Sequence, residues 1–370
     1  MEEKTMRILM IGPFPPPIHG MSLANRMLRD GLAERGHQVE TLNTHTGTSF
    51  GNLKNQGRFT PNKLIGSVSQ IFRGIVRILF GPRLDVVYIT PAQSEWGYMK
   101  YTPFIFSSSI RGIRVFIHIH GGYFRTMYDS SKGWKRWLVK KSLDRISGAI
   151  VLGSSLRYMF EGLIGGEKIF ICSNAVEEEI FATEDELEWK RERRNRDDTI
   201  RIIYLSNLMR KKGILDLLEA VNILKKTGVK VHLDLAGAIE PDIESEVKQY
   251  LSQLDTCVTY HGIVKGEEKK RLFLRNYTFC LPTYYPNEGQ PIALLEAIVN
   301  GCFCVVTKWS GIIDIARPKF SAFTDAKEPV VLAEILKENR KPIFDINRSA
   351  FSISLFSDRI TEIFKSDTNV

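Results

Sequence analysis

The order of apolar and polar segments along the chain predicts alternating strands and helices. Short apolar runs bounded by Gly, Pro or polar residues have the length and composition of buried strands. Between them lie amphipathic stretches such as 19–37, where apolar residues recur at helical spacing. Because parallel strands are joined through helical crossovers, this alternation predicts parallel sheets covered by helices on both faces. In the first half of the chain the expected strands are 7–14, 38–44, 84–90, 114–121 and 146–155.

The alternation is interrupted once, by a charged stretch without core periodicity at 182–199, with the sequence ATEDELEWKRERRNRDDT. It then restarts with apolar runs of the same kind, so the sequence predicts two α/β domains, 1–178 and 199–347. A length of 370 residues suits two cores rather than one. The remaining segment, 348–370, contains a helix that we expect to pack back on the first domain. Open α/β sheets bind ligands at the carboxyl ends of their strands, which predicts a cleft there.

The net charge of +9 is confined to the first half of the chain. Residues 1–180 hold 23 Lys and Arg against 14 Asp and Glu, whereas residues 181–370 hold 28 of each sign. The first half is therefore expected to face an anionic partner, either lipid headgroups, a pyrophosphate or nucleic acid. Nucleic acid is the weakest of the three, because no binding motif accompanies the charge. No apolar run approaches the ~18 residues of a membrane span and no signal peptide is evident, which predicts a cytoplasmic protein.

Two segments of the basic half have features of a membrane surface. The first, 133–145, combines aromatic and basic side chains suited to headgroups, although a solvated helix face is the alternative. Its residues of interest are Trp134, Lys135, Arg136, Trp137, Lys140 and Lys141. The second, 63–80, predicts a helix with Arg73 and Arg77 opposite an apolar face, and an ordinary sheet-covering helix is the favoured interpretation there. That face is formed by Leu64, Val68, Ile71, Ile75 and Leu79.

A pair of glutamates brackets a turn before an apolar helix in the second half. Pro291 suits the first turn of a helix that ends at Gly301, with Glu288 in the preceding loop and Glu296 in the second turn. Unpaired backbone donors at a helix start favour phosphate or hydroxyl groups. The donors here belong to the stretch around Gly289, Gln290 and Ile292. The alternative is that Glu288 only compensates the helix dipole and Glu296 lies on a solvated face.

The segment EGQPIALLE resembles the E-x7-E signature of glycosyltransferase family 4, whose members are retaining enzymes of the GT-B fold. Further segments match family motifs in the family's order, so the resemblance covers nearly the whole chain. They are GPFPPPIHGMS (12–22), HIHGG (118–122), CSNAVEEEIF (172–181) and SNLMRKKGILDLLEA (206–220). The resemblance implies an α/β protein of GT-B architecture, with two Rossmann-like domains facing each other across a central cleft. It assigns acceptor binding to the first domain and nucleotide-sugar binding to the second.

The resemblance also implies roles for residues of the second domain. Glu288 would contact the hydroxyls of the donor sugar, and Glu296 those of the nucleotide ribose. Lys212 stands where the family has a lysine for the donor diphosphate, whereas its alternative is an ordinary surface lysine. Asn207 replaces the usual arginine of that motif, and we expect Arg210 to supply the missing charge. The stretch 261–264, which contains Gly262, corresponds to the backbone that meets the nucleobase.

In the first domain, the resemblance places His120 at the family's cleft histidine, although a core or edge histidine is the alternative on residues alone. The glycine loop of the family usually has two adjacent glycines, and here it reads His19-Gly20. Close backbone approach to the donor phosphates is therefore expected at Gly20 only.

The implied reaction moves a hexose or N-acetylhexosamine from a nucleotide diphosphate sugar, with retention, and needs no cofactor or metal. The implied acceptor is a glycan, carried on a polyprenyl diphosphate during surface polysaccharide or O-antigen synthesis, at an anionic cytoplasmic membrane face. Alternatives on the same fold are a nucleotide-sugar epimerase or a phosphorylase. A degenerate, non-catalytic subunit is a further alternative, motivated by Asn207 and the single Gly20. The donor base, sugar, linkage and oligomeric state do not follow from these residues.

Overall fold

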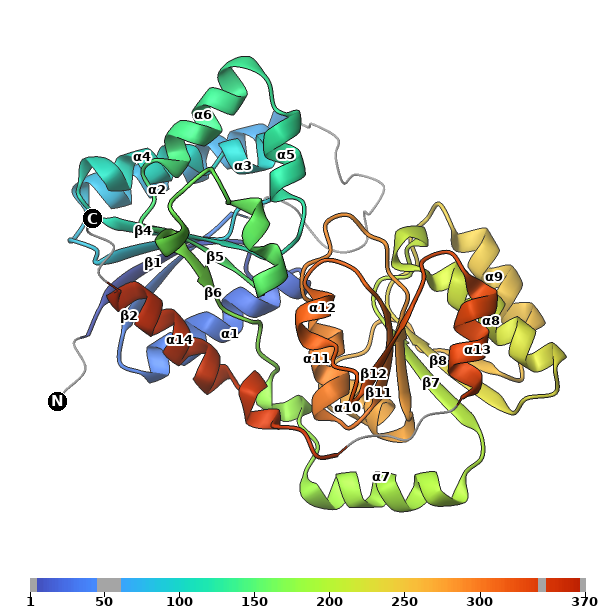
Figure 1. The fold of residues 1–370 in the computed structure, drawn as a ribbon. Helices are drawn as coiled ribbons and strands as arrows, with labels where there is room; N and C mark the ends of the chain where they lie inside the picture. Colours follow the sequence, from blue (N-terminus) through green and yellow to red (C-terminus); the bar gives the residue numbers. More distant parts are fainter. Residues whose placement is uncertain (1–4, 45–60, 339–343, 367–370) are drawn as a thin grey trace. The chain divides into compact units, whose positions relative to one another are not determined.

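The computed structural model describes residues 5–44, 61–338 and 344–366, which form two compact units (Figure 1). The first unit comprises Met1–Ala175 and Ile353–Val370, and the second comprises Val176–Ser352. Each unit has its own six-stranded sheet, and every pairing in both sheets is parallel. The predicted α/β architecture of two similar domains is therefore confirmed.

The sheet of the first unit has the strand order β2-β1-β3-β4-β5-β6. Most of its strands are apolar runs buried on both faces, as expected for a parallel sheet. Their bounds are β1 Arg7–Gly12, β2 Gln38–Asn43, β3 Val86–Ile89, β4 Arg114–Ile119, β5 Gly148–Val151 and β6 Ile169–Ile171. The sequence analysis did not predict β6.

Helices cover both faces of this sheet. Alternate strand residues such as Leu9 and Ile11 pack with Ile78, Phe104 and Val139 from the helices of one face. The helices of that face are α2 Pro61–Phe80, α3 Glu95–Met99, α4 Thr102–Ile110, α5 Phe124–Ser130 and α6 Gly133–Leu143. Helix α1 (Gly20–Glu34) and the C-terminal helix α14 (Ile353–Lys365) pack together on the other face (Figure 1). No helix among the described residues is long and apolar enough to cross a membrane.

Helix α14 belongs to the first unit although it follows the second in sequence. Arg35, at the end of α1, pairs with Asp358 at 2.6 Å, and its guanidinium also donates to the Ser354 carbonyl. A Cβ on Gly31 would lie 2.1 Å from the Ser357 hydroxyl oxygen, so the glycine allows the two helices to approach closely. The Phe364 ring packs on Phe116 of β4. The chain thus returns to the first unit, which is the arrangement expected for 348–370.

The sheet of the second unit has the order β12-β11-β10-β7-β8-β9. Its strands are β7 Ile200–Leu205, β8 Val231–Ala236, β9 Val258–Tyr260, β10 Thr278–Leu281, β11 Phe303–Thr307 and β12 Ser321–Thr324. The helices of the unit are α7 Glu184–Arg196, α8 Ile214–Lys226, α9 Glu244–Gln253, α10 Gly266–Arg275, α11 Ile292–Val299, α12 Ile312–Ile315 and α13 Pro329–Lys337. From β7 the chain moves outward through β8 and β9, then returns to place β10 on the other side of β7. The order of strands therefore reverses at β7 and β10.

The charged stretch 182–199 belongs to the second unit, which corrects the predicted start of that domain at 199. The division of the chain falls at Ala175, and most of the stretch forms helix α7 inside the second unit. Thr183 caps this helix with Glu186 in a capping box. Lys190 is fully buried and donates to the carbonyls of Phe273 (2.9 Å) and Asn300 (2.7 Å). The sequence analysis did not predict α7 because one of its two buried residues is a lysine, and lysines are normally expected at solvated positions.

The turn after β7 requires glycine at position 213. Gly213 has φ +75°, and a Cβ there would lie 2.2 Å from the carbonyl oxygen of Pro282, which follows β10. Gly228, after α8, has the same backbone conformation (φ +76°) but open space around it. Comparing substitutions at the two glycines therefore separates the energetic cost of a left-handed backbone from that of a steric clash.

We expect Gly213→Ala to lower the free energy of unfolding by about 3 kcal/mol or more, because it combines left-handed strain with a main-chain clash. Gly228→Ala should cost about 1 kcal/mol from the left-handed conformation alone. Urea denaturation of both variants measures the difference. Equal losses would contradict the close packing of the loops after β7 and β10.

Candidate functional site

A buried ion pair joins the two loops at the point where the strand order reverses. Lys212 lies in the short 3-10 turn Arg210–Lys212 after β7, and Glu288 lies in the loop after β10. Lys212 Nζ is 2.7 Å from Glu288 Oε2, and the side chains are only 14% and 8% exposed. Loops at such a reversal form the usual ligand crevice of an open α/β sheet. The structure therefore brings together two residues predicted from separate motifs 76 positions apart.

The loop that carries Glu288 is held by hydrogen bonds from three directions. Thr283 Oγ1 donates to Glu288 Oε2 at 3.1 Å, and Thr307 Oγ1 donates to the Thr283 carbonyl. The Trp309 indole donates to the Tyr285 carbonyl at 2.8 Å. The Tyr284 amide donates to the Lys211 carbonyl at 2.8 Å, which ties this loop to the one carrying Lys212. The carboxylate of Glu288 is thus fixed before any ligand binds.

Glu296 is paired with a different lysine. It lies in α11 and is 2% exposed, so the alternative that it occupies a solvated helix face is wrong. Lys269 of α10 places Nζ 2.5 Å from Glu296 Oε1 and 4.0 Å from Glu177 Oε2. The helix begins at Ile292 and is followed by Gly301 in the left-handed conformation.

The turn before α11 is packed into the unit. Gly289 and Gln290 are buried, and so is Ile292 at the helix start. Pro291 is the N-cap residue rather than part of the first turn. The roles of this turn and of Glu296 toward a nucleotide stay predictions.

Asn207, which stands where the motif usually has an arginine, and Arg210 are both exposed. Asn207 is exposed, and its carbonyl accepts a hydrogen bond from the Tyr204 hydroxyl at 3.1 Å. Arg210 forms a bidentate ion pair with Glu246 of α9 instead of joining Lys212 and Glu288. That Arg210 replaces the missing arginine stays a prediction, and it requires the exposed pair with Glu246 to open.

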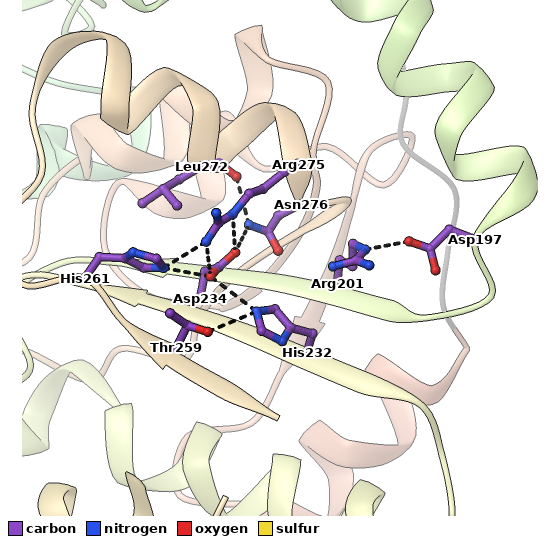
Figure 2. A network of polar contacts seen from close by, with 9 residues as sticks. All are labelled: Asp197, Arg201, His232, Asp234, Thr259, His261, Leu272, Arg275 and Asn276. Carbon is purple, nitrogen blue, oxygen red and sulfur yellow. Dashed lines mark hydrogen bonds and ion pairs between the residues drawn. The ribbon is translucent and has the colours of Figure 1, made fainter. Parts of the chain in front are cut away.

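A polar network on one face of β8 and β9 was not predicted from the sequence (Figure 2). Asp234 of β8 is 1% exposed and accepts hydrogen bonds from Arg275 Nε at 2.8 Å and Asn276 Nδ2 at 2.7 Å, both at the end of α10. His261 Nε2, directly after β9, is 2.8 Å from Asp234 Oδ1. Although burial opposes the charge, bonds from His232, Arg275, Asn276 and His261 lower the pKa of Asp234 far below its usual value. The signal was an aspartate inside an apolar strand run, VHLDLA.

The same network holds the start of the loop 261–264. Gly262 has φ +67°, and its carbonyl accepts a hydrogen bond from the Gly237 amide at 2.7 Å. Gly237 itself admits no side chain, since a Cβ would lie 1.9 Å from the Ser206 carbonyl oxygen. The loops after β7, β8 and β9 are therefore connected through backbone contacts, and Asp234 fixes the His261 ring that begins the third of them.

In the first unit, His118 of β4 and His120, directly after β4, have ring centroids 4.2 Å apart, with the rings tilted by 34°. His118 is fully buried and lies 2.7 Å from the Tyr88 hydroxyl. Burial lowers the pKa of His120 to about 4, opposed by the Asn174 side chain and reinforced by the charge of His19. His120 is therefore neutral at pH 7. Its predicted place in a ligand site is compatible with this environment, which also suits a histidine with a structural role.

His19 and Gly20 begin helix α1 after β1. The His19 ring accepts a hydrogen bond from the Ser22 amide, and Ser22 Oγ accepts one from the His19 amide at 2.9 Å, which completes a capping box. A Cβ on Gly20 would meet nothing within 4 Å. The backbone at Gly20 is open, as the predicted approach of a phosphate requires, and binding there stays a prediction.

Helix α6 displays the predicted aromatic and basic surface. Trp134 and Trp137 are 58% and 61% exposed, and Trp96 of α3, which was not predicted, packs edge-on against Trp134. Lys135 pairs with Glu95, and Lys140 pairs with Asp144. Arg136 and Lys141 are exposed, with Arg136 lying over the Tyr128 ring. Part of the basic charge is thus already neutralised within the unit.

Within the described ranges, no group of three or more His, Cys, Asp or Glu side chains is arranged to hold a metal ion. A reaction without metal or cofactor stays a prediction.

Comparison with known proteins supports a glycosyltransferase function for the second unit. Residues 185–338 match the family model described as Glycosyl transferases group 1. A curated relative, the amylovoran biosynthesis glycosyltransferase AmsK of Erwinia amylovora, is 30% identical over 130 residues, which cover 34% of this chain. The matched region spans 31% of the length of AmsK.

Solved glycosyltransferase structures share the fold along nearly the whole chain. HepE of Anabaena, solved with UDP-glucose, superposes with a TM-score of 0.66 at 16% identity, covering 96% of this chain and 98% of HepE. The lipopolysaccharide outer core galactosyltransferase WaaB superposes with a TM-score of 0.65 at 16% identity, covering 97% and 99% of the two chains. The fold is therefore GT-B. The match to group 1 glycosyl transferases covers residues 185–338, which lie in the second unit.

Substitution of Asp234 by Asn should lower the free energy of unfolding of the second unit by about 3 kcal/mol, because Arg275 would then lack its buried anionic partner. The matched control is Asp197→Asn, whose partner Arg201 lies at the start of β7 in a pair that is 26% and 19% exposed (Figure 2). A loss of about 1 kcal/mol is expected there. Hydrogen exchange should show faster exchange of the Gly237 amide in the Asp234 variant alone. Unchanged protection of Gly237 would argue against the bracing of these loops.

The first unit should lose stability as the pH falls from about 6.5 to about 4. In this window His120 takes up a proton in the unfolded chain but not in the native state, so protons favour unfolding. The contribution of His120 is at most about 3 kcal/mol. Urea denaturation across this pH range should show a smaller loss of unfolding free energy for His120→Gln than for the wild type. The reference is pH 8, where His120 is neutral in both the native and the unfolded state. Parallel pH profiles would show that the ring nitrogens of His120 are not shielded from water.

Proposed function

We propose that this protein is a retaining glycosyltransferase that moves a hexose or N-acetylhexosamine from a nucleotide diphosphate sugar to a glycan acceptor. The observation that carries the proposal is the buried Lys212–Glu288 pair at the strand reversal of the unit that matches group 1 glycosyl transferases. The similar protein HepE has been solved in complex with UDP and with UDP-glucose, which supports a nucleotide sugar as the donor class.

Glu288 and Lys212 are assigned to different parts of the nucleotide-sugar donor. Lys212 and Thr283 both contact Oε2 of Glu288, so Oε1 is the oxygen that we assign to a donor-sugar hydroxyl. An ammonium group has three N–H donors, and one directed at Glu288 leaves others for the diphosphate oxygens. Lys212 would stabilise the negative charge that develops on the departing nucleotide diphosphate. Glu296 is assigned to the ribose, with Lys269 holding its carboxylate in place.

The proposed transfer proceeds on one face of the sugar. The bond from the anomeric carbon to the diphosphate oxygen breaks, the bond to the acceptor oxygen forms on the same face, and the acceptor's proton goes to the departing phosphate. The charge of that phosphate would be met by Lys212 and by backbone donors of its loop, so the proposal needs no metal. His120 is the candidate from the first unit for a contact with the reacting sugar.

For the acceptor we propose a glycan on a polyprenyl diphosphate carrier, extended during surface polysaccharide or O-antigen synthesis at an anionic cytoplasmic membrane face. Two observations support this choice. The similar proteins AmsK and WaaB are an amylovoran biosynthesis glycosyltransferase and a lipopolysaccharide outer core galactosyltransferase. The exposed Trp134, Trp137, Arg136 and Lys141 of α6 combine aromatic rings and positive charge, as headgroup contacts do.

Glu288→Gln should lower turnover at least tenfold while the protein stays folded. The amide has one acceptor oxygen and no charge, so it cannot both accept a hydrogen bond from a sugar hydroxyl and form an ion pair with Lys212. Glu186→Gln is the matched control: its carboxylate also pairs with a lysine, Lys270, at 2.7 Å in the same unit, and glutamine preserves its capping role. The assay is sugar transfer after a thermal-shift screen with UDP, GDP, ADP and their sugar conjugates has identified the donor. Wild-type turnover in Glu288→Gln would remove the assigned role. A chain that binds no nucleotide would fit the non-catalytic subunit instead, and release of altered sugar without an acceptor would indicate an epimerase.

A further inference from the structure

Helix α2 (Pro61–Phe80) buries one apolar face against the first unit. Ile71, Ile75 and Ile78 pack against the core under the sheet. Gly74 allows this approach, since a Cβ there would lie 2.4 Å from the Phe104 ring. Sequence reasoning favoured such a sheet-covering helix and is correct for Ile71 and Ile75. It is wrong for Val68, which was assigned to the same face but is 58% exposed on the other side of the helix. The Leu64 side chain lies outside the described part of the chain.

The C-terminal end of α2 is fixed in place by Arg111, which follows α4. One nitrogen of its guanidinium, Nη1, donates to the carbonyls of Ile78 (3.0 Å), Leu79 (3.1 Å) and Gly81 (3.0 Å). These carbonyls have no partner within the helix because they belong to its last turn and beyond. The orientation of α2 about its own axis is therefore set by the core on one side and by Arg111 at the end.

With the inner face fixed, the outer face presents a second apolar row. Val68, Phe72, Val76 and Phe80 recur at every fourth position, which places them along one side of the helix. Their exposed fractions are 58%, 66%, 38% and 80%. Ile110, the residue before Arg111, is 78% exposed. Single exposed apolar residues are ordinary on protein surfaces, but a continuous row with two phenylalanines marks an interaction surface.

The charged residues within α2 itself are all basic. The 20 residues of α2 include Lys63, Arg73 and Arg77 and no acidic residue, and Arg77 pairs with Glu40 outside the helix. In the whole chain, the segments of the first unit hold 25 Lys and Arg against 14 Asp and Glu, a net charge of +11. The second unit holds 26 against 28, a net charge of −2. The excess positive charge thus lies entirely in the unit that displays the apolar row.

We propose that α2 is an interfacial helix whose outer row enters the apolar boundary of an anionic lipid layer. A helix with apolar side chains on one side and basic residues without acids elsewhere lies in such an interface with its apolar face roughly 5–10 Å deep. A second copy of this chain is a less suitable partner for the row. A symmetric contact would bring together two copies of the first unit, each with a net charge of +11. The inference adds an apolar contact to the proposed membrane location, and it is independent of the transfer reaction.

The experiment is vesicle flotation of the full-length protein with phosphatidylcholine vesicles, with and without phosphatidylglycerol, at low and high salt. The wild type should bind the anionic vesicles. Phe72→Gln/Phe80→Gln should bind them at least tenfold more weakly at both salt concentrations, because the lost contact is apolar and is not screened. Trp134→Gln/Trp137→Gln keeps the α2 row intact and should retain more binding than the α2 variant at high salt.

The matched control is Trp189→Gln, which removes a 50% exposed aromatic residue from helix α7 of the second unit and should bind as the wild type does. Light scattering of each protein without vesicles reports a second copy, and a change from dimer to monomer in the α2 variant would overturn the proposal. So would undiminished vesicle binding of that variant, or a wild type that binds neither vesicle. If the double variant fails to fold, Phe72→Gln alone gives the same comparison. A nucleotide-induced thermal shift on the same samples tests the proposed function separately, since failure of membrane binding leaves that shift unchanged.

Discussion

The buried ion pair between Lys212 and Glu288 is the interaction on which the arrangement of the second unit's site depends. A carboxylate that is 8% exposed needs a partner, since a buried, unpaired charge is costly. The partner comes from the loop after β7, which is next to β10 only because the chain has doubled back in the sheet. Gly213 then lets that loop pass against the Pro282 carbonyl. Topology, a left-handed glycine and one ion pair together place both charges at the strand reversal.

The sequence predicted the architecture well because the fold follows from patterns that are local. Each buried strand is a short apolar run, and each crossover helix shows its own period, so two parallel sheets could be expected without knowing which residues meet. The short strands β6 and β12 were missed, and β12 (SAFT) has polar residues at both ends instead of a continuous apolar run. The start of the second domain was predicted too late because α7 contributes Lys190 to the interior. The polarity of a lysine does not show that its ammonium group will donate to two buried carbonyls.

The candidate site was predictable where a motif carries the residues and not where only the fold brings them together. Lys212 and Glu288 each belong to a motif, and their pairing agrees with a shared ligand. The partner of Glu296 is Lys269, 27 positions earlier on another helix, and no local pattern indicates it. The Asp234 network is similar: its members come from β8, β9 and the end of α10, so their meeting depends on strand order and helix placement rather than on spacing.

The two motif glutamates differ in how firmly their lysine partners are held. Lys269 holds Glu296 from the body of α10 and is itself only 8% exposed, so this pair is part of the unit's interior and presents a carboxylate in one fixed direction. Lys212 instead extends from a three-residue turn, and its ammonium lies 5.5 Å from the Tyr285 ring, which gives it a second favourable contact that does not compete for hydrogen bonds. A lysine with this freedom can keep one N–H on Glu288 and direct the others to an anion. The fixed pair suits recognition of a neutral hydroxyl pattern, whereas the adaptable pair suits a group whose charge changes during a reaction, and that difference arises from the elements that carry the two lysines.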